Sequence, residues 1–365
     1  MINDQVQPLR VSLTNVTGLG ASILAQSLVT AFEASQSLQI SKYYVPVAGE
    51  FAKCGANITD KFEIYRRKLP NSISRVLECT LLAGYFDGPV PLLVLGDLPL
   101  ATTARQIVFV QSAHLIGDVT TNGLLDRLRY KIARLIVRRN QRHVAAFVVQ
   151  SEIMRYGLAE TYQIDPGRIH VVAQPPPAWL LDSRLVRCST DQKRGEPLRL
   201  FYPAAAYPHK NHDLLSGAQG DSSWSELIDT LTLTIEPGLY PLTESWIDCA
   251  GQLHTEAVID AYRRSDALVF LSKTESFGFP LIEAMWVGLP IVCPDLPYAH
   301  TLCGDQAIYF DPDDIESLKA ALMILRARLD EGWWPDWTDQ LEKIPSSWDD
   351  VAKAISEIVV GVDRP

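Results

Sequence analysis

Short apolar runs alternate with longer segments of helical periodicity along most of the chain. An apolar run of four to eight residues indicates a buried strand, whereas apolar residues three or four positions apart indicate a helix. Strands and helices in alternation predict a parallel sheet covered by helices. In the first half the predicted strands are residues 9–13, 40–47, 91–95, 107–110, 143–150 and 168–173, and the predicted helices include 22–34, 123–141 and one running from Ser151 to near Gly157.

The same alternation starts again near residue 198. Its predicted strands are residues 198–202, 231–235, 246–250, 267–271 and 290–294, with helices at 315–325 and in the last 20 residues. The intervening run, 174–197, has four prolines, mixed charge and no clear period, which is typical of a linker between domains. We therefore predict an α/β protein with domains at 1–173 and 198–345, a linker at 174–197 and a final helix at 346–365.

The chain length agrees with two domains, and the net charge restricts the possible classes of function. At 365 residues the chain exceeds the usual size of one hydrophobic core. A formal charge of −10 argues against a nucleic-acid binder, because phosphate backbones are held by surplus Lys and Arg. No apolar run approaches the roughly 20 residues of a membrane helix, and the first residues lack a signal-peptide profile, so we expect a cytoplasmic protein. The six cysteines are scattered, which predicts neither a zinc site nor a disulfide framework.

One segment is strongly basic, although the chain as a whole is acidic. Residues 127–142 hold seven Lys or Arg and no acid. A basic amphipathic helix can lie on anionic lipid, so we expect peripheral membrane contact through residues 124–142. The alternative is a helix that packs on the core and exposes a solvated basic face. The apolar positions at helical spacing are Leu124, Leu125, Leu128, Ile132, Leu135 and Ile136.

The most informative stretch is residues 267–297, which predicts a strand, a polar loop, a helix and a second strand. Pro280 suits the first turn of the helix, and Gly288 suits its end. Two carboxylates, Glu275 and Glu283, lie at the loop-to-helix joint with seven residues between them. An ordinary helix with two solvated glutamates would show the same bare spacing.

The backbone of Phe277, Gly278 and Phe279 opens this helix. A helix N-terminus offers unsatisfied N–H groups and a partial positive charge, so it can hold an anion such as a diphosphate. Carboxylates can accept hydrogen bonds from sugar hydroxyls. The pattern therefore predicts a phosphate site with a carboxylate on either side.

The segment ESFGFPLIE resembles the Glu-x7-Glu motif of retaining GT-B glycosyltransferases of the GT4 family, and the following GLPIV segment is similar to that family too. The resemblance implies two Rossmann-like, doubly wound domains facing a cleft, with the C-terminal helix packed back on the first domain. It also implies a nucleotide-diphosphate sugar on the second domain. Glu283 would bind the ribose diol and Glu275 the sugar hydroxyls.

A second resemblance lies in PHKNH, just after the strand at 198–202. It is similar to a GT4 phosphate-binding segment, in which Lys210 would contact the diphosphate with help from His209. The family commonly has an Arg six residues before this lysine, where this chain has Ala204. Lys210 would then carry more of the charge neutralisation, although an isolated lysine is usually a surface residue.

The first domain supplies weaker candidates. Gly18 and Gly20 follow the first strand, where a glycine turn would approach the donor phosphates, although a plain tight turn fits as well. Gln111 and His114 follow the strand at 107–110, and Asp97 follows the preceding strand. Many GT4 enzymes have a functional His near this point. Gln111 occupies its place by strand end and His114 lies three residues on, so the sequence leaves open which of them takes that role.

The resulting prediction is a retaining, metal-independent glycosyltransferase without a cofactor. It would move a sugar to a glycan or polyprenyl-linked acceptor in surface polysaccharide assembly, at the inner face of the membrane. One alternative is a catalytically silent sugar-nucleotide-binding subunit, which the Ala204 and Gln111 departures favour. Another is a GT-B sugar-nucleotide epimerase, which would need acid and base groups from both domains. The sugar, the nucleotide, the linkage and the oligomeric state are not predicted.

Overall fold

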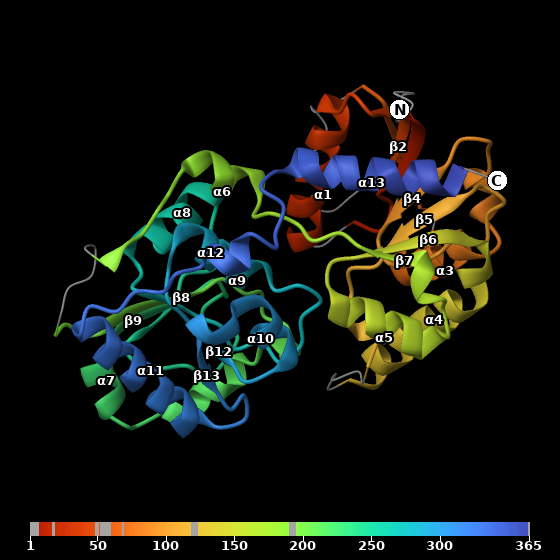
Figure 1. Cartoon of the computed structure of the whole chain (residues 1–365). Coiled ribbons are helices and arrows are strands. Elements are labelled where there is room, and N and C mark those ends of the chain that lie inside the picture. The colour runs from red at the N-terminus through yellow and green to blue at the C-terminus, as the bar shows by residue number, and fades with distance from the viewer. Residues whose placement is uncertain are drawn as a thin grey trace. The chain divides into compact units, whose positions relative to one another are not determined.

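The computed structural model describes residues 7–16, 19–47, 51, 60–67, 69–117, 123–189 and 195–363. The chain divides into two compact units (Figure 1). Unit 1 comprises residues 1–175 and 345–365, and unit 2 comprises residues 176–344. Among the described helices, none combines the length and the apolar character needed to cross a bilayer.

Unit 1 is built on a seven-stranded parallel sheet in the order β3-β2-β1-β4-β5-β6-β7. The chain adds β2 and β3 on one side of β1 and then returns to add β4 on the other side. The strands are β1 (Gln7–Ser12), β2 (Leu38–Pro46), β3 (Phe62–Tyr65), β4 (Leu92–Leu95), β5 (Gln106–Phe109), β6 (Val144–Val149) and β7 (Ile169–Val171). The helices are α1 (Leu19–Ala34), α3 (Asn71–Cys79), α4 (Leu124–Asn140), α5 (Glu152–Tyr162) and α13 (Trp348–Asp363).

Unit 2 repeats this plan with six parallel strands in the order β10-β9-β8-β11-β12-β13. Here the strand order reverses between β8 and β11. The strands are β8 (Leu198–Tyr202), β9 (Ile228–Leu233), β10 (Ile247–Cys249), β11 (Ala267–Val269), β12 (Ile291–Pro294) and β13 (Ile308–Phe310). The helices are α6 (Ala178–Ser183), α7 (Ser223–Leu227), α8 (Thr255–Arg264), α9 (Phe279–Val287), α10 (Pro297–Cys303), α11 (Ile315–Asp330) and α12 (Thr338–Leu341).

The central strands are buried along their whole length, which explains the unbroken apolar runs in the sequence. Every residue of β4, β5 and β12 is buried. The predicted strand at 198–202 coincides with β8. The predicted doubly wound α/β architecture is confirmed in each unit, whereas the cleft between the two domains stays a prediction.

Helix α5 differs from the prediction at its C-terminal end. Ser151 caps its start by accepting a hydrogen bond from the Met154 N–H at 3.3 Å, as expected. The helix continues past Gly157 to Tyr162 and ends at Gln163, which has a φ of 56°. Gly157 serves packing instead, because a Cβ there would lie 2.6 Å from Cδ1 of Ile116. The glycine marks a close contact within the unit and no helix end.

The predicted linker also differs from the structure. Residues 178–183 form α6, whose Leu180 is fully buried. The buried Arg187 guanidinium donates to the carbonyls of Tyr262 at 3.1 Å and Ser265 at 2.6 Å. This segment is therefore a folded part of unit 2, not a loose connection.

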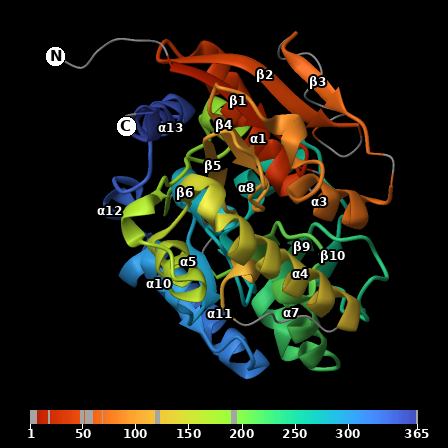
Figure 2. The same cartoon turned by 90° about the vertical axis from the view of Figure 1, so that its right-hand side faces the viewer.

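The C-terminal helix α13 belongs to unit 1, where it contacts α1, β1 and β6 (Figure 2). It buries Val351, Ile355 and Val359, which recur every four residues on one face. Ser356 Oγ also donates to the carbonyl of Ser37 at 3.4 Å. The last helix thus completes the core of the unit that contains the first strand.

We expect Leu180→Ala to lower the free energy of unfolding by about 3 kcal/mol, because it removes a fully buried side chain from α6. Urea denaturation followed by circular dichroism measures this loss. Val186→Ala, at an exposed position of the same segment, is the control and should change stability by less than about 0.5 kcal/mol. Equal, small effects of both changes would mean that the segment is not packed on unit 2.

Candidate active site

Two loops of unit 2 meet at the carboxyl ends of its central strands. β11 pairs with β8 through Ala267 with Leu200 and Leu268 with Phe201, so the two strands end at the same edge of the sheet. The strand order reverses between them, which is where open α/β sheets form a ligand crevice. The loops are tied together, since the Lys273 N–H donates to the carbonyl of His209 at 2.8 Å.

These loops bring Lys210 and Glu275 into contact. The Lys210 Nζ forms an ion pair with the Glu275 carboxylate, and the two side chains are only 15% and 12% exposed. The Lys210 carbonyl accepts a hydrogen bond from the Tyr202 hydroxyl at 2.7 Å, which fixes the backbone on which the lysine stands. A cation and a carboxylate predicted for the same ligand are therefore neighbours, although 65 residues separate them in the sequence.

Helix α9 begins at Phe279, shortly after Glu275 in the sequence. Gly278 is its N-cap residue, with a φ of 87° in the left-handed region that favours glycine, and Pro280 lies in the first turn. Because glycine has no side chain, the N-cap residue itself cannot cap the first N–H groups of the helix. Phe277 is buried and contacts the Phe279 ring edge-to-face, with 5.4 Å between ring centroids. The role predicted for the N–H groups of residues 277–279 in binding an anion stays a prediction.

Glu283 lies about one turn further along α9 and is 8% exposed. Its Oε2 accepts a hydrogen bond from the Tyr262 hydroxyl of α8 at 2.6 Å. Burial raises the pKa of the Glu283 carboxyl from 4.5 to about 7, and the hydrogen bond from Tyr262 partly opposes this rise. The carboxyl therefore changes charge near neutral pH.

The remaining residues of the PHKNH segment occupy different environments. The His209 ring stacks on Tyr207 at 5.7 Å between ring centroids. Ala204, where the related segment has Arg, is buried, and its carbonyl accepts from the Thr234 hydroxyl at 3.3 Å. This position therefore contributes no positive charge beside Lys210.

Two residues of this region were not found from the sequence. His212 is fully buried between Tyr202 and Tyr240, and neither ring nitrogen has a hydrogen-bond partner among the described residues. Burial lowers its pKa to about 4, so the ring is neutral at physiological pH. The second histidine of PHKNH was a signal for it. Tyr262 has no such signal, because its contact with Glu283 joins two separate helices.

In unit 1, the structure describes only part of the segment between β1 and α1. Gly18, predicted to approach the donor phosphates, lies outside the described residues. Gly20 is inside the first turn of α1, which begins at Leu19, and a Cβ there would meet nothing within 4 Å. The prediction that Gly20 forms the turn before a helix starting near residue 22 is wrong, since the helix starts earlier.

Gln111 and His114 both follow β5 and are half-buried. The Gln111 N–H donates to Asp97 Oδ1 at 2.6 Å, and Asp97 has a φ of 74°. The His114 ring contacts Tyr130 of α4, and its carbonyl accepts from the Arg134 guanidinium at 3.0 Å. Asp97 therefore supports the loop that carries both candidates, and these contacts favour neither residue for the histidine role.

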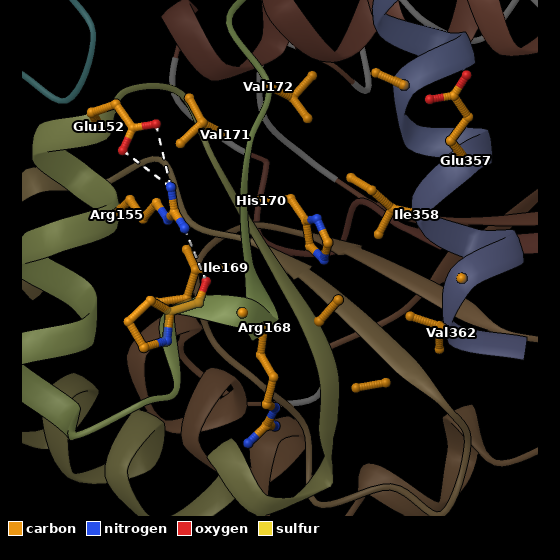
Figure 3. A pocket seen from close by; sticks show the side chains of 16 residues that line it. Glu152, Arg155, Arg168, Ile169, His170, Val171, Val172, Glu357, Ile358 and Val362 are labelled. Carbon is orange, nitrogen blue, oxygen red and sulfur yellow. Dashed lines mark hydrogen bonds and ion pairs between the residues drawn. The ribbon is translucent and has the colours of Figure 1, made fainter. Parts of the chain in front are cut away.

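A cavity of about 820 Å³ lies elsewhere in unit 1, along β7 and between α5 and α13 (Figure 3). Glu152 and Arg155 form an ion pair at one side of it, and Glu357 stands on the α13 side. Burial lowers the pKa of His170, which points into this space from β7. None of the residues predicted for the donor site lines this cavity.

Residues 245–326, which include Glu275 and Glu283, match the family model described as "Glycosyl transferases group 1". The O-antigen chain mannosyltransferase B of Escherichia coli is 32% identical over 120 residues, which are 33% of this chain and 29% of that protein. The O-antigen chain mannosyltransferase RfbU of Salmonella typhimurium is 24% identical over 201 residues, 52% of this chain and 53% of that protein. The chain therefore spans between about a third and half of the length of these relatives.

Solved structures resemble the chain over nearly its whole length. WaaG, a glycosyltransferase involved in lipopolysaccharide biosynthesis, gives a TM-score of 0.62 at 15% identity and covers 97% of this chain and 100% of its own. A glycosyltransferase from Rickettsia africae ESF-5 also gives 0.62, at 14% identity, with 98% and 94% covered. The fold is therefore two parallel-sheet, Rossmann-like α/β domains, as in GT-B glycosyltransferases.

The raised pKa of Glu283 predicts a stability that depends on pH. The folded protein holds this proton more tightly than the unfolded chain, so the ionised carboxyl costs stability as pH rises from 4.5 through 7. We expect Glu283→Gln to raise the free energy of unfolding by about 3 kcal/mol at pH 8 and to leave it unchanged at pH 4.5, because the amide cannot ionise.

Urea denaturation of both proteins at the two pH values checks this difference. Glu342→Gln, at an exposed glutamate of unit 2, serves as the control and should give no pH-dependent gain. A pH-independent difference between wild type and Glu283→Gln would contradict the raised pKa.

Proposed function

We propose that the protein is a retaining, metal-independent glycosyltransferase of the GT4 family. It would transfer a sugar from a nucleotide-diphosphate sugar to a glycan or polyprenyl-linked acceptor in surface polysaccharide assembly. The observation that carries the proposal is the Lys210–Glu275 ion pair at the strand-order reversal of unit 2, directly before the start of α9. The match of residues 245–326 to the group 1 family model and the names of the two mannosyltransferase relatives support it.

The ion pair explains how the site would receive its donor. Without ligand, Lys210 and Glu275 neutralise each other in a poorly exposed position. A diphosphate would compete for Lys210 and for the N–H groups of residues 277–279, with His209 close by. Glu275 would then be released from the lysine and could accept hydrogen bonds from sugar hydroxyls.

Glu283 would bind the other end of the donor. Its carboxylate, held by the Tyr262 hydroxyl, would accept hydrogen bonds from the ribose diol. Because these bonds require an acceptor, the ionised form binds better, and donor affinity would fall as pH decreases through about 7. The buried position of Glu283 thus couples donor affinity to pH.

The reaction would break the bond between the anomeric carbon and the phosphate oxygen and form a bond from that carbon to an acceptor hydroxyl oxygen. The acceptor proton leaves with the diphosphate, on the same face of the sugar when configuration is retained. Negative charge develops on the leaving diphosphate, and Lys210 with the α9 N–H groups would stabilise it without a metal ion. In unit 1, Gln111 or His114 would take the role of the family's histidine.

A catalytically silent binding subunit is the second candidate. Ala204 supports it, because the cation that helps to hold the diphosphate in related segments is missing there. Such a subunit would still bind a nucleotide diphosphate, since Lys210 and the start of α9 are in place. The difference between the candidates lies in transfer and not in binding.

The proposal also includes the place of action. A polyprenyl-linked acceptor is held in a membrane, and nucleotide sugars are cytoplasmic metabolites. We therefore place the protein in the cytoplasm, in contact with the inner face of the membrane through residues 124–142.

Two substitutions test the donor site. Lys210→Ala should weaken binding of UDP or GDP about 10- to 100-fold, because a buried charge-assisted contact to the diphosphate is lost. Glu275→Ala should leave binding of the bare nucleotide diphosphate within a few-fold but lower sugar transfer about 100-fold or more. Isothermal titration calorimetry measures the first effect, and nucleotide release from donor sugars with membrane extract as acceptor source measures the second.

Lys273→Ala is the matched control, because Lys273 lies in the same loop but pairs with Asp313 at 2.5 Å. It should affect neither measurement by more than about two-fold. Wild-type protein that binds nucleotide diphosphate but releases none from any donor sugar would favour the silent subunit. If the wild-type protein binds neither UDP nor GDP, both candidate functions are contradicted.

A further inference from the structure

The cavity of unit 1 lies at one edge of its sheet. β7 is the last strand in the order of the described strands and pairs with β6 only. α5 forms one wall of the cavity and α13 the other, with β7 between them (Figure 3). All of its lining residues belong to unit 1. Its volume of about 820 Å³ lies within the range of small-molecule sites, roughly 300–1,000 Å³.

Arg155 is the charged group of this cavity that its present partners satisfy least. Its guanidinium donates to Glu152 at 3.4 Å and 3.5 Å and to the carbonyl of Pro166 at 3.5 Å. These bonds are long, because charged groups usually form hydrogen bonds of about 2.7–2.9 Å. The Arg155 Nε is buried and has no hydrogen-bond partner among the described residues. An anion that takes two donors of the guanidinium would replace long contacts by shorter ones.

The distribution of charge around the cavity favours an anion inside it. Arg155, Arg168 and His170 are half-buried, whereas Glu152 and Glu357 are exposed. The two acids are therefore solvated at the rim, and the groups further inside are donors. Arg168 is held by two backbone carbonyls. The His170 ring points into the cavity (Figure 3), and burial together with the charge of Arg155 lowers its pKa, so it is a neutral donor at physiological pH.

The wall formed by α13 is apolar and leaves room. Ile358 and Val362 stand on the cavity side of this helix (Figure 3), and Ala354 and Gly361 line the same wall. A Cβ on Gly361 would meet nothing within 4 Å, so the space beside it is open. This wall suits an apolar group and not a second charge.

We propose that this cavity binds a small molecule that carries one carboxylate or phosphate group on an apolar body. The anion would replace Glu152 as the partner of Arg155 and would accept a hydrogen bond from His170. The apolar body would contact Ile358 and Val362. A peptide strand fits less well, because β7 has only three residues and offers few backbone hydrogen bonds. The proposal is independent of the donor site, since no residue of that site lines the cavity.

Isothermal titration calorimetry of the purified full chain tests the ligand class with four probes. They are 2-naphthoate, 2-naphthyl phosphate, uncharged 2-naphthol, and acetate, which lacks the apolar body. At least one of the two anionic naphthalenes should bind about 10-fold or more tightly than 2-naphthol and than acetate, because each control lacks one of the two contacts. The tighter of the two anionic probes identifies the preferred anion.

Three substitutions test the residues. Arg155→Met should weaken binding of the tighter anionic probe about 10-fold or more, since it removes the charge-assisted contact. Glu152→Gln should tighten binding several-fold, because it removes the acid that competes for Arg155. Gly361→Phe should weaken binding about 10-fold or more by filling the open space, whereas Gly361→Ala should bind within about two-fold of wild type.

Arg263→Met is the matched control for Arg155→Met, because Arg263 forms the same i,i+3 type of ion pair, with Asp260 on α8. It should bind the probe like wild type. Lys210→Ala should also leave probe binding unchanged, so failure of the donor site and failure of this cavity are distinguishable. Circular dichroism shows that each variant is folded. Hydrogen exchange should slow on probe binding in residues 168–172 and 354–362, which line the cavity from β7 and α13.

Four results would overturn the proposal. They are no binding of either anionic naphthalene by wild type, equal affinity for 2-naphthol, binding that persists unchanged in both Arg155→Met and Gly361→Phe, and binding that Lys210→Ala abolishes. The last result would assign the probe to the loops of unit 2. Loss of nucleotide-diphosphate binding with intact probe binding would instead contradict the proposed enzymatic function and leave the cavity site in place.

Discussion

The candidate site depends on one constraint, the ion pair between Lys210 and Glu275 at the point where the strand order of unit 2 reverses. β8 and β11 must lie side by side for the two loops to meet, and the buried apolar strands on either side keep them there. The pair is poorly exposed, so water screens it weakly and its geometry is well held. The same loop leads from Glu275 into the start of α9, whose Glu283 is hydrogen-bonded to Tyr262.

The sequence predicted what depends on local pattern and missed what depends on distant contacts. The strand at 198–202 and the Ser151 cap were predicted because a buried run and an N-cap residue carry their own signal. Gly157 was misinterpreted as a helix end. The structure shows that a side chain at this position would collide with Ile116, which lies 41 positions earlier in the sequence. The burial of Leu180 within the predicted linker was missed for a similar reason, because a proline-rich composition does not show what a segment packs against.

The candidate site shows the same difference between local patterns and distant contacts. Lys210 and Glu275 were expected at one ligand site from a resemblance and from the rule for ligand sites in open sheets, whereas their ion pair was not predicted. The partner of Glu283 could not be expected, because Tyr262 reaches it from another helix. The candidate site residues of unit 1 were harder to predict, because Gln111 and His114 lie in a loop that is held by hydrogen bonds to Asp97 and from Arg134. The sequence thus proposed candidate site residues, whereas the side chains that contact and support them were found only in the structure.

Helix α13 gives the chain an unusual order of assembly. Unit 2 is one continuous stretch, whereas unit 1 takes its final helix from the other end of the chain. During synthesis, the surfaces of α1 and β1 that contact α13 stay uncovered until α13 leaves the ribosome. The unit translated second can therefore finish folding first, and the unit translated first is the one exposed to chaperones and proteases for longest.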